Sequence, residues 1–105
     1  MTPLSIKKIK EISYQRPELE HGYAGKTLSI DLTDNKIRIN DVTETMKRVF
    51  IGGKGFDLWL LWNAVTENTR WNDPENAICI SCGPLGGTPT YPGSGKSIVA
   101  TLSPP

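Results

Sequence analysis

The stretch Cys82-Gly-Pro-Leu-Gly-Gly-Thr-Pro-Thr-Tyr-Pro-Gly-Ser-Gly-Lys-Ser97 decides how this 105-residue chain folds. It holds five glycines, three prolines and one lysine between two apolar runs. Proline lacks the amide hydrogen that a helix or a central strand needs, and glycine weakens both, so the composition predicts an irregular loop. Glycine also lets backbone N–H groups approach a ligand closely, which makes this long glycine loop a candidate anion-binding segment.

The whole chain has the composition of one small domain. It carries 12 basic and 11 acidic residues, for a net charge of +1, and neither sign is strongly clustered. This balance gives no electrostatic footprint for nucleic acid. No apolar stretch approaches the roughly 18 residues that span a bilayer, and two cysteines without an export signal indicate reduced thiols. We therefore expect a cytoplasmic protein with neither a nucleic-acid nor a membrane partner.

The first third of the chain predicts a leader followed by a hairpin. Residues 1–21 carry little periodic signal beyond Ile6, Ile9 and Ile12, so we expect a leader that wraps around the domain or adds a short helical turn. From Lys26 to Leu32 apolar and polar residues alternate, which predicts a half-buried strand. Asp34-Asn35 supplies turn chemistry and the alternation restarts at residues 37–39, so the segment is a β-hairpin.

Two short helices are expected next. Thr43 is a suitable N-cap for a helix from Glu44 to Phe50, ended by Gly52-Gly53. A second helix runs from about Lys54 to Val65, and its apolar residues occupy two opposite faces: Phe56, Trp59 and Leu60 on one, and Leu58, Leu61, Trp62 and Val65 on the other, with Asp57 and Asn63 as the breaks. A helix that is apolar all round needs burial on nearly every side. A chain of this length has little with which to bury it, so we expect it to pack against protein outside this chain.

The last third predicts two strands on either side of the long glycine loop. A turn at residues 72–76 precedes a buried strand from Ala77 to Ser81, and a second strand runs from Ser97 to Leu102 with Ile98 and Val99 in its core. The order of hairpin, two helices, strand, loop and strand favours an α+β fold over alternating βαβ units. Since the chain stops soon after the last strand, we expect residues 22–105 to be a partial domain of a truncated or split polypeptide.

The end of the long glycine loop imitates a nucleotide-binding loop. Gly95-Lys96-Ser97 matches the second half of the pattern Gly-x-x-x-x-Gly-Lys-Ser/Thr, but the first glycine is replaced by Thr90. The residues after Lys96 are β-branched and predict a strand, which leaves no helix N-terminus to hold phosphates. A small P-loop-like nucleotide-binding protein therefore stays an alternative. A second alternative is a non-catalytic interaction module that docks a partner through an exposed surface at Trp59 and Trp62.

The remaining reactive residues predict no catalytic set. Cys79 and Cys82 form a Cys-x-x-Cys pattern, but residues i and i+3 of a strand point to opposite faces. We therefore expect two buried structural cysteines and no metal site. His21, Asp31 and Asp57 lack the spacing of an acid–base pair or a triad.

A second glycine loop, Ile51-Gly-Gly-Lys-Gly55, lies between the two expected helices. Its glycines suit a helix–helix hinge, and they equally suit a backbone loop in which Lys54 meets an anionic group. Together with the loop that ends at Lys96, it gives two glycine loops that each present a lysine. Such a pair suits a phosphate- or pterin-bearing ligand, which is bound by many backbone donors and few charges.

These two loops, in this order, resemble the N-terminal domain of the aldehyde ferredoxin oxidoreductase family of tungsten (rarely molybdenum) enzymes. The matching segments are Gly25-Lys-Thr-Leu-Ser-Ile-Asp-Leu-Thr33, Phe50-Ile-Gly-Gly-Lys-Gly55, Pro74-Glu-Asn76, Gly83-Pro-Leu-Gly-Gly-Thr88, Pro92-Gly-Ser-Gly-Lys96 and Ser103-Pro104. The resemblance covers about residues 22–104. It implies twisted mixed or antiparallel β-sheets with two short helices, forming half of a two-repeat domain that is the base under a bis-pterin tungsten or molybdenum cofactor.

The resemblance also implies a chemistry and a set of cofactor contacts. In the family, aldehyde or carboxylate-type oxidation or reduction occurs at the metal, and electrons leave through a [4Fe–4S] cluster to ferredoxin or electron-transfer subunits. The implied contacts are Lys96 on the pterin, Gly93 and Gly95 for close backbone approach, and Lys54 as a weaker contact. The chain holds no catalytic residue or metal ligand of the family, since the cluster cysteines lie in later domains.

One position departs from the family pattern. The family has an arginine after the glycine-rich loop, where this chain has Lys96. Lysine keeps the positive charge but loses the planar, bidentate fork. This departure favours a divergent paralogue. The long leader and the run Phe56-Asp-Leu-Trp59 look nearer to the tungsten subunits of multi-subunit complexes, such as the benzoyl-coenzyme A reductase type. We expect the isolated chain to be inactive, and to work with the remaining domains or with a companion chain of the same enzyme.

Overall fold

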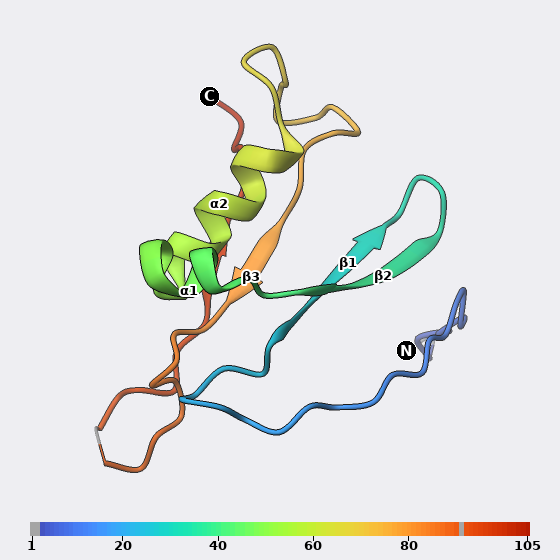
Figure 1. The fold of residues 1–105 in the computed structure, drawn as a ribbon. Helices are drawn as coiled ribbons and strands as arrows, with labels where there is room; N and C mark the ends of the chain where they lie inside the picture. Colours follow the sequence, from blue (N-terminus) through green and yellow to red (C-terminus); the bar gives the residue numbers. More distant parts are fainter. Residues whose placement is uncertain (1–2, 91) are drawn as a thin grey trace.

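A computed structural model describes residues 3–90 and 92–105 of the chain (Figure 1). Its elements in order are β1 (Lys26–Asp31), β2 (Lys36–Asp41), α1 (Glu44–Phe50), α2 (Lys54–Ala64), β3 (Cys79–Ser81) and β4 (Ile98–Ala100). The strands form two separate antiparallel pairs, β1–β2 and β3–β4. Two short helices with small antiparallel sheets confirm the α+β class.

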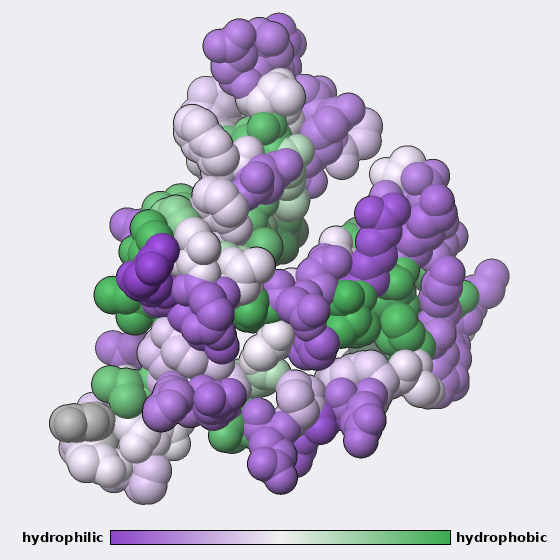
Figure 2. All heavy atoms as spheres, viewed as in Figure 1, coloured by the Kyte–Doolittle hydropathy of each residue, from purple (hydrophilic) through white to green (hydrophobic). Residues whose placement is uncertain are grey.

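The hairpin β1–β2 forms as the alternation predicts. Leu28 lies opposite Ile39 and Ile30 opposite Ile37, so one face of the ribbon is apolar. The carboxylate of Asp31 accepts hydrogen bonds from two backbone amides of the turn, at 2.9 and 3.1 Å. The predicted half-burial of the first strand is wrong. Leu28 and Ile30 are 55% and 56% exposed although their partners Ile37 and Ile39 are half-buried, so the described part of the chain covers this face only partly (Figure 2).

The first helix has the predicted bounds and the predicted cap. The Oγ1 of Thr43 accepts a hydrogen bond from the backbone N–H of Met46 at 3.1 Å, which satisfies one of the free amides at the helix start. The residue that follows α1 and caps its C-terminus is Ile51, which has a φ of 66°. A positive φ is unusual for a β-branched residue and turns the chain sharply into Gly52 and Gly53.

The small core lies where α1 and the β3–β4 pair pack against α2. Its buried apolar residues are Met46, Phe56, Leu61 and Cys79. The face of α2 that is buried differs from the sequence interpretation. Asp57, expected as a polar break in an apolar ring, is completely buried, whereas Leu58 and Trp62 are 49% and 78% exposed.

The strands β3 and β4 are shorter than predicted and largely open on one side. Ile80 pairs with Val99, and the side chains are 66% and 59% exposed. Because residues alternate across a strand, Ile80 and Val99 share the face opposite that of buried Cys79. Ile98 is 38% exposed. The prediction that Ile98 and Val99 form a core is therefore wrong for the described part of this chain.

The described part of the leader forms no helical turn. Residues 3–19 have neither helix nor strand, and Leu4 and Ile6 are more than nine-tenths exposed. The first ordered pairing is between Glu20 and Tyr23, whose backbones exchange hydrogen bonds of 3.0 and 2.9 Å. Among the described residues, none of the helices has the length and apolar character needed to span a membrane.

The chain exposes more surface than a self-contained domain of its mass. Its accessible surface is 9066 Å² and its radius of gyration is 15.9 Å. Folded monomers of 11.6 kDa expose about 5,800 Å², and 105 residues pack to a radius of about 13 Å. The extended leader and the open faces of the hairpin, α2 and the β3–β4 pair all contribute to this excess (Figure 2).

Candidate functional site

The two glycine loops pack directly against each other. Gly52 and Gly53 have φ angles of 155° and 54°. A Cβ on Gly52 would lie 2.9 Å from the Cδ of Pro84, and one on Gly53 would lie 3.2 Å from the Cδ1 of Ile98. The short glycine loop, Ile51–Gly55, therefore touches both ends of the segment that carries the long glycine loop, and glycine is required at these contacts.

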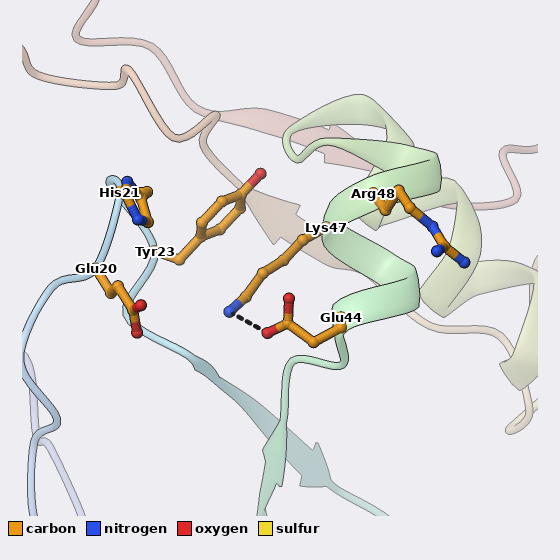
Figure 3. Close-up of a pocket in the computed structure, with 6 residues that line it drawn as sticks. All are labelled: Glu20, His21, Tyr23, Glu44, Lys47 and Arg48. Atoms are coloured by element: carbon orange, nitrogen blue, oxygen red, sulfur yellow. Dashed lines mark hydrogen bonds and ion pairs between the residues drawn. The ribbon is translucent and has the colours of Figure 1, made fainter.

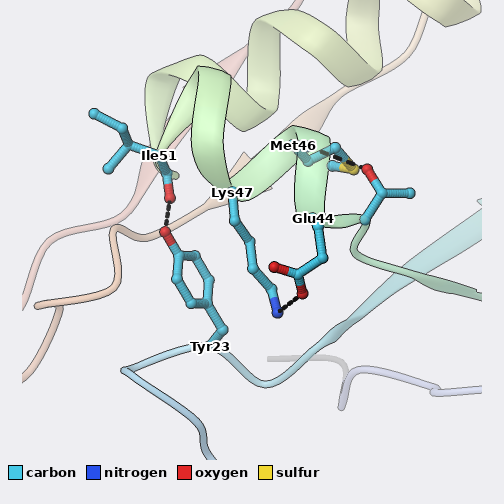
Figure 4. A network of polar contacts seen from close by, with 6 residues as sticks. Tyr23, Glu44, Met46, Lys47 and Ile51 are labelled. Carbon is cyan, nitrogen blue, oxygen red and sulfur yellow. Dashed lines mark hydrogen bonds and ion pairs between the residues drawn. The ribbon is translucent and has the colours of Figure 1, made fainter.

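Two side chains that the sequence did not indicate hold the short glycine loop in place. The hydroxyl of Tyr23 donates to the carbonyl of Ile51 (Figure 4), and the ring of Tyr23 stacks on Phe56 with centroids 6.1 Å apart. The hydroxyl of Ser81 donates to the carbonyl of Gly53 at 2.7 Å. Each of these hydrogen bonds joins residues 28 positions apart, so no local pattern could reveal them.

The long glycine loop reaches away from the helices and the hairpin (Figure 1). Its neck is closed by the Gly87 amide, which donates to the carbonyl of Ser94 at 3.2 Å, and by the Ser94 hydroxyl, which donates to the carbonyl of Thr88 at 2.8 Å. A Cβ on Gly93 or Gly95 would meet no atom of the described residues within 4 Å. Gly93 has a φ of 80°, but Gly95 has no positive φ. The described fold therefore gives no reason for glycine at position 95.

The two lysines of the predicted site are both exposed. Lys54 is the first residue of α2, and Lys96 follows Gly95 on the approach to β4. Neither forms an ion pair with any residue that the structure describes. Their ammonium groups are open to an anionic partner, and their roles toward a cofactor stay predictions.

The Cys-x-x-Cys pair is split by the structure. Cys79 is buried in β3 and Cys82 is exposed at the start of the long glycine loop, so the prediction of two buried cysteines is wrong for Cys82. Both thiols are free. In residues 3–90 and 92–105, no group of three or more His, Cys, Asp or Glu side chains could hold a metal ion.

Asp57 is the most strongly perturbed group near the loops. Its side chain has no exposed surface, and neither carboxyl oxygen has a hydrogen-bond partner among the described residues. Burial raises the pKa of Asp57, and the nearby Ser81 hydroxyl offsets part of that rise. Burial and the negative charge of Asp57 together raise the pKa of Cys79.

A shallow, open cavity lies beside Tyr23 and contains none of the predicted site residues (Figure 3). It measures about 330 Å³ and is lined by Glu20, His21, Tyr23, Glu44, Lys47 and Arg48. The Lys47 ammonium lies 3.1 Å from Glu44 and 5.3 Å from the centroid of the Tyr23 ring. This lysine is already engaged by a carboxylate and an aromatic face, whereas Arg48 forms no ion pair with any residue that the structure describes.

A comparison with known proteins shows the family of this chain. Residues 27–105 match the family model described as "Aldehyde ferredoxin oxidoreductase, N-terminal domain". The chain belongs to the aldehyde ferredoxin oxidoreductase N-terminal domain family. The match begins at the first strand and includes both glycine loops.

Three curated relatives of this family domain come from Pyrococcus species. The chain is 37% identical over 83 residues to an "Aliphatic sulfonate oxidoreductase, WOR-like subunit" of Pyrococcus furiosus, covering 76% of this chain and 13% of the relative. It is 34% and 32% identical, over 83 residues each, to the "Tungsten-containing aldehyde ferredoxin oxidoreductase" of Pyrococcus abyssi and of Pyrococcus horikoshii, covering 79% of this chain and 14% of each relative. The matched part of the chain thus spans about one seventh of these relatives' length. No solved structure gives a significant match.

The structure also bears on the two alternative functions, a small nucleotide-binding protein and a non-catalytic interaction module. A nucleotide-binding loop needs a helix after Lys96, and the strand β4 stands there instead. The surface at the two tryptophans is only partly open. Trp59 is half-buried and stacks on Phe50 with ring centroids 5.0 Å apart, whereas Trp62 is 78% exposed.

Proposed function

We propose that this domain forms part of the base that holds a bis-pterin tungsten cofactor in a larger oxidoreductase of the aldehyde ferredoxin oxidoreductase type. The observation that carries the proposal is the open glycine at position 95, which stands between Gly93 and an exposed Lys96. Glycine with neither a positive φ nor a close neighbour is expected where a ligand approaches the backbone. Membership of a family with tungsten-containing relatives supports a tungsten cofactor as this ligand.

The residues present fit an anionic, pterin-bearing group. Lys96 would bind its negative oxygens as a point charge, and Lys54 would supply a second, more distant cation. Gly93 and Gly95 would let backbone N–H groups come within hydrogen-bond reach. When bound, the cofactor supplies the redox chemistry at its metal, on aldehydes or carboxylates, and the domain contributes binding and orientation.

Electron transfer would use protein outside this chain. We assign a [4Fe–4S] cluster and its cysteine ligands to later domains or a companion chain, with ferredoxin or an electron-transfer subunit as the acceptor. The open apolar surfaces support such neighbours, because a contiguous exposed patch usually marks an interface. Leu28 and Ile30 on the hairpin and Leu58 and Trp62 on α2 would be covered in the whole enzyme, and the isolated chain would be inactive.

The proposal is tested by substitution at Lys96 in the full-length protein that carries this chain. Hydrogen bonds to charged groups contribute about 1.5–3 kcal/mol, so Lys96→Ala should lower cofactor occupancy by about tenfold or more under limiting cofactor. Lys96→Arg keeps the charge and should retain occupancy. Tungsten is measured by elemental mass spectrometry, and pterin by the fluorescence of its oxidised form.

The matched control is Lys36→Ala, which removes an exposed lysine from the hairpin, away from both glycine loops. It should keep the tungsten and pterin content of the wild type. Lys54→Ala should lower occupancy less than Lys96→Ala does. Full occupancy in Lys96→Ala would contradict the assigned contact, whereas equal losses in Lys96→Ala and Lys36→Ala would show a general effect on folding.

A further inference from the structure

A tight turn precedes the part of the chain that matches the family. The backbones of Glu20 and Tyr23 exchange hydrogen bonds of 3.0 and 2.9 Å across His21 and Gly22. These two central residues have φ angles of 52° and 83°. Two positive φ angles in succession are typical of a type I′ turn, which favours glycine and asparagine, and histidine is among the other residues that tolerate this region. The turn therefore has a defined geometry, although it lies ahead of residue 27, where the family match begins.

The turn contacts both glycine loops. A Cβ on Gly22 would lie 2.0 Å from the carbonyl oxygen of Pro84, so the turn packs against the long glycine loop near its start. The hydroxyl of Tyr23 donates to the carbonyl of Ile51 in the short glycine loop (Figure 4). The ring of Tyr23 stacks on Phe56 of α2, and the ammonium group of Lys47 in α1 lies 5.3 Å from the ring centroid. Two residues of this one turn thus join both helices to both loops.

The hydrogen bond from Tyr23 falls on a strained part of the short glycine loop. Ile51 has a φ of 66° and a ψ of −56°, and the amide of Gly52 donates to the carbonyl of Phe50 at 2.7 Å. These angles and this bond define the rare γ-turn with a positive φ, which is strained, and a β-branched residue fits it poorly. The side chain of Ile51 is 64% exposed, so its own packing offsets little of the strain. Such a conformation persists only where the surrounding contacts impose it.

The other hydrogen bonds of the loop leave the carbonyl of Ile51 to Tyr23. The hydroxyl of Ser81 donates to the carbonyl of Gly53, and the amide of Ile51 donates to the carbonyl of Lys47 at 3.1 Å. Among the residues that the structure describes, no group except the Tyr23 hydroxyl donates to the carbonyl of Ile51. Loss of this hydroxyl should therefore free the γ-turn while the rest of the loop stays attached.

We propose that the turn at residues 20–23 is a clasp for the short glycine loop, with Tyr23 as its positioning residue. The hydroxyl of Tyr23 holds the carbonyl of Ile51 in the direction that the γ-turn requires. Because the chain passes through this γ-turn from α1 into α2, the clasp also fixes where Lys54 begins the second helix. The inference goes beyond the proposed function and is independent of the cofactor.

Hydrogen exchange of the full-length protein tests the clasp locally. Amide protection in peptides that cover residues 50–55 is followed by mass spectrometry at a fixed pH. Tyr23→Phe removes the hydroxyl but keeps the ring for its contacts with Phe56 and Lys47. Protection should fall by about fivefold, which is the contribution of a neutral hydrogen bond. Tyr14→Phe is the matched control, because Tyr14 is 58% exposed in the leader, and this variant should keep the wild-type protection.

A second variant tests the strain in the γ-turn. Ile51→Gly removes the β-branched side chain that makes a positive φ costly, so it should raise the protection of the same peptides by about threefold or more. In the double variant, Ile51→Gly should restore much of the protection that Tyr23→Phe loses.

Three results would overturn the clasp. Wild-type protection in Tyr23→Phe would mean that the ring alone holds the turn, and an equal loss in Tyr14→Phe would mean that the effect is not local. Lower protection in Ile51→Gly than in the wild type would mean that the turn is not strained. If Tyr23→Phe fails to fold, Ile51→Gly decides the question: raised protection supports the proposal, and unchanged or lowered protection overturns it.

Discussion

The two glycine loops use glycine for opposite reasons. In the short loop the neighbours demand it: a Cβ on Gly55 would lie 2.2 Å from the carbonyl oxygen of Phe50, and one on Gly52 would collide with Pro84 at 2.9 Å. In the long loop a Cβ on Gly93 or Gly95 would enter open space. The first loop is therefore shaped by this chain's own packing, whereas the second has open space beside Gly93 and Gly95, where the proposed cofactor would approach.

This contrast separates structural from functional interpretations of a motif. Glycine-rich segments look alike in a sequence, but the space around each missing Cβ differs. Gly53 is buried, fixed by Ser81 and close to Ile98, so its loop is a rigid support. Gly95 and Lys96 are exposed, in a loop that reaches away from the helices (Figure 1). Substitutions in the two loops should consequently affect different quantities, stability in one and cofactor occupancy in the other.

The largest effect on stability is expected for Gly55→Ala. Alanine favours a helix over glycine by about 1 kcal/mol, which would stabilise α2. The new Cβ would however meet the backbone carbonyl of Phe50 at 2.2 Å, and overpacking of this kind costs about 1–3 kcal/mol or more. We expect a net loss of about 2 kcal/mol, measured by urea unfolding beside the wild type. A stabilised Gly55→Ala variant would show that the loop is not tightly packed.

The next prediction concerns the two cysteines, of which Cys79 is buried in β3 and Cys82 is exposed. Burial and the charge of Asp57 raise the pKa of Cys79, so at neutral pH less of it is in the reactive thiolate form. Cys82 is exposed at the start of the long loop. Iodoacetamide at pH 7.5 should therefore alkylate Cys79 at least about tenfold more slowly than Cys82. Peptide mass spectrometry over time gives both rates, and equal rates would mean that α2 does not protect β3.

A smaller effect is expected at the helix that leads into the short loop. Thr43→Ala removes the Oγ1 that accepts the Met46 amide and should cost about 1 kcal/mol. Thr43→Ser keeps an acceptor at the same place and should restore most of that stability. Both changes are read from urea midpoints. If the two variants were equally destabilised, the lost methyl group rather than the cap would be responsible.

Local patterns predicted the elements well. The alternation around Leu28 and Ile30 predicted the hairpin, and Thr43 together with the glycines after Phe50 predicted the bounds of α1 to the residue. These signals are short-range, since strand alternation and caps depend on neighbours a few positions apart. The glycine loops were likewise found by composition, and the family match includes both of them.

Burial was predicted poorly, for a physical reason. Hydrophobicity indicates that a side chain favours burial, but it does not show which part of a protein buries it. Val99 and Leu28 look like core residues and are exposed in this chain, whereas Asp57 looks like a surface residue and is fully buried. The fastening of the short loop by Tyr23 and Ser81 was also missed, because each contact spans 28 residues of sequence.

The smallest effect on stability, and the sharpest test of the contrast, is expected for Gly95→Ala. Its Cβ would meet no described neighbour within 4 Å and needs no positive φ, so the unfolding midpoint should stay within about 0.5 kcal/mol of the wild type. In the full-length protein the same methyl group would occupy the space assigned to the cofactor. Tungsten and pterin content should therefore fall although stability does not. If Gly95→Ala keeps the tungsten and pterin content of the wild type, the proposed cofactor contact at Gly95 is wrong. If it loses as much stability as Gly55→Ala, glycine does not have different roles in the two loops.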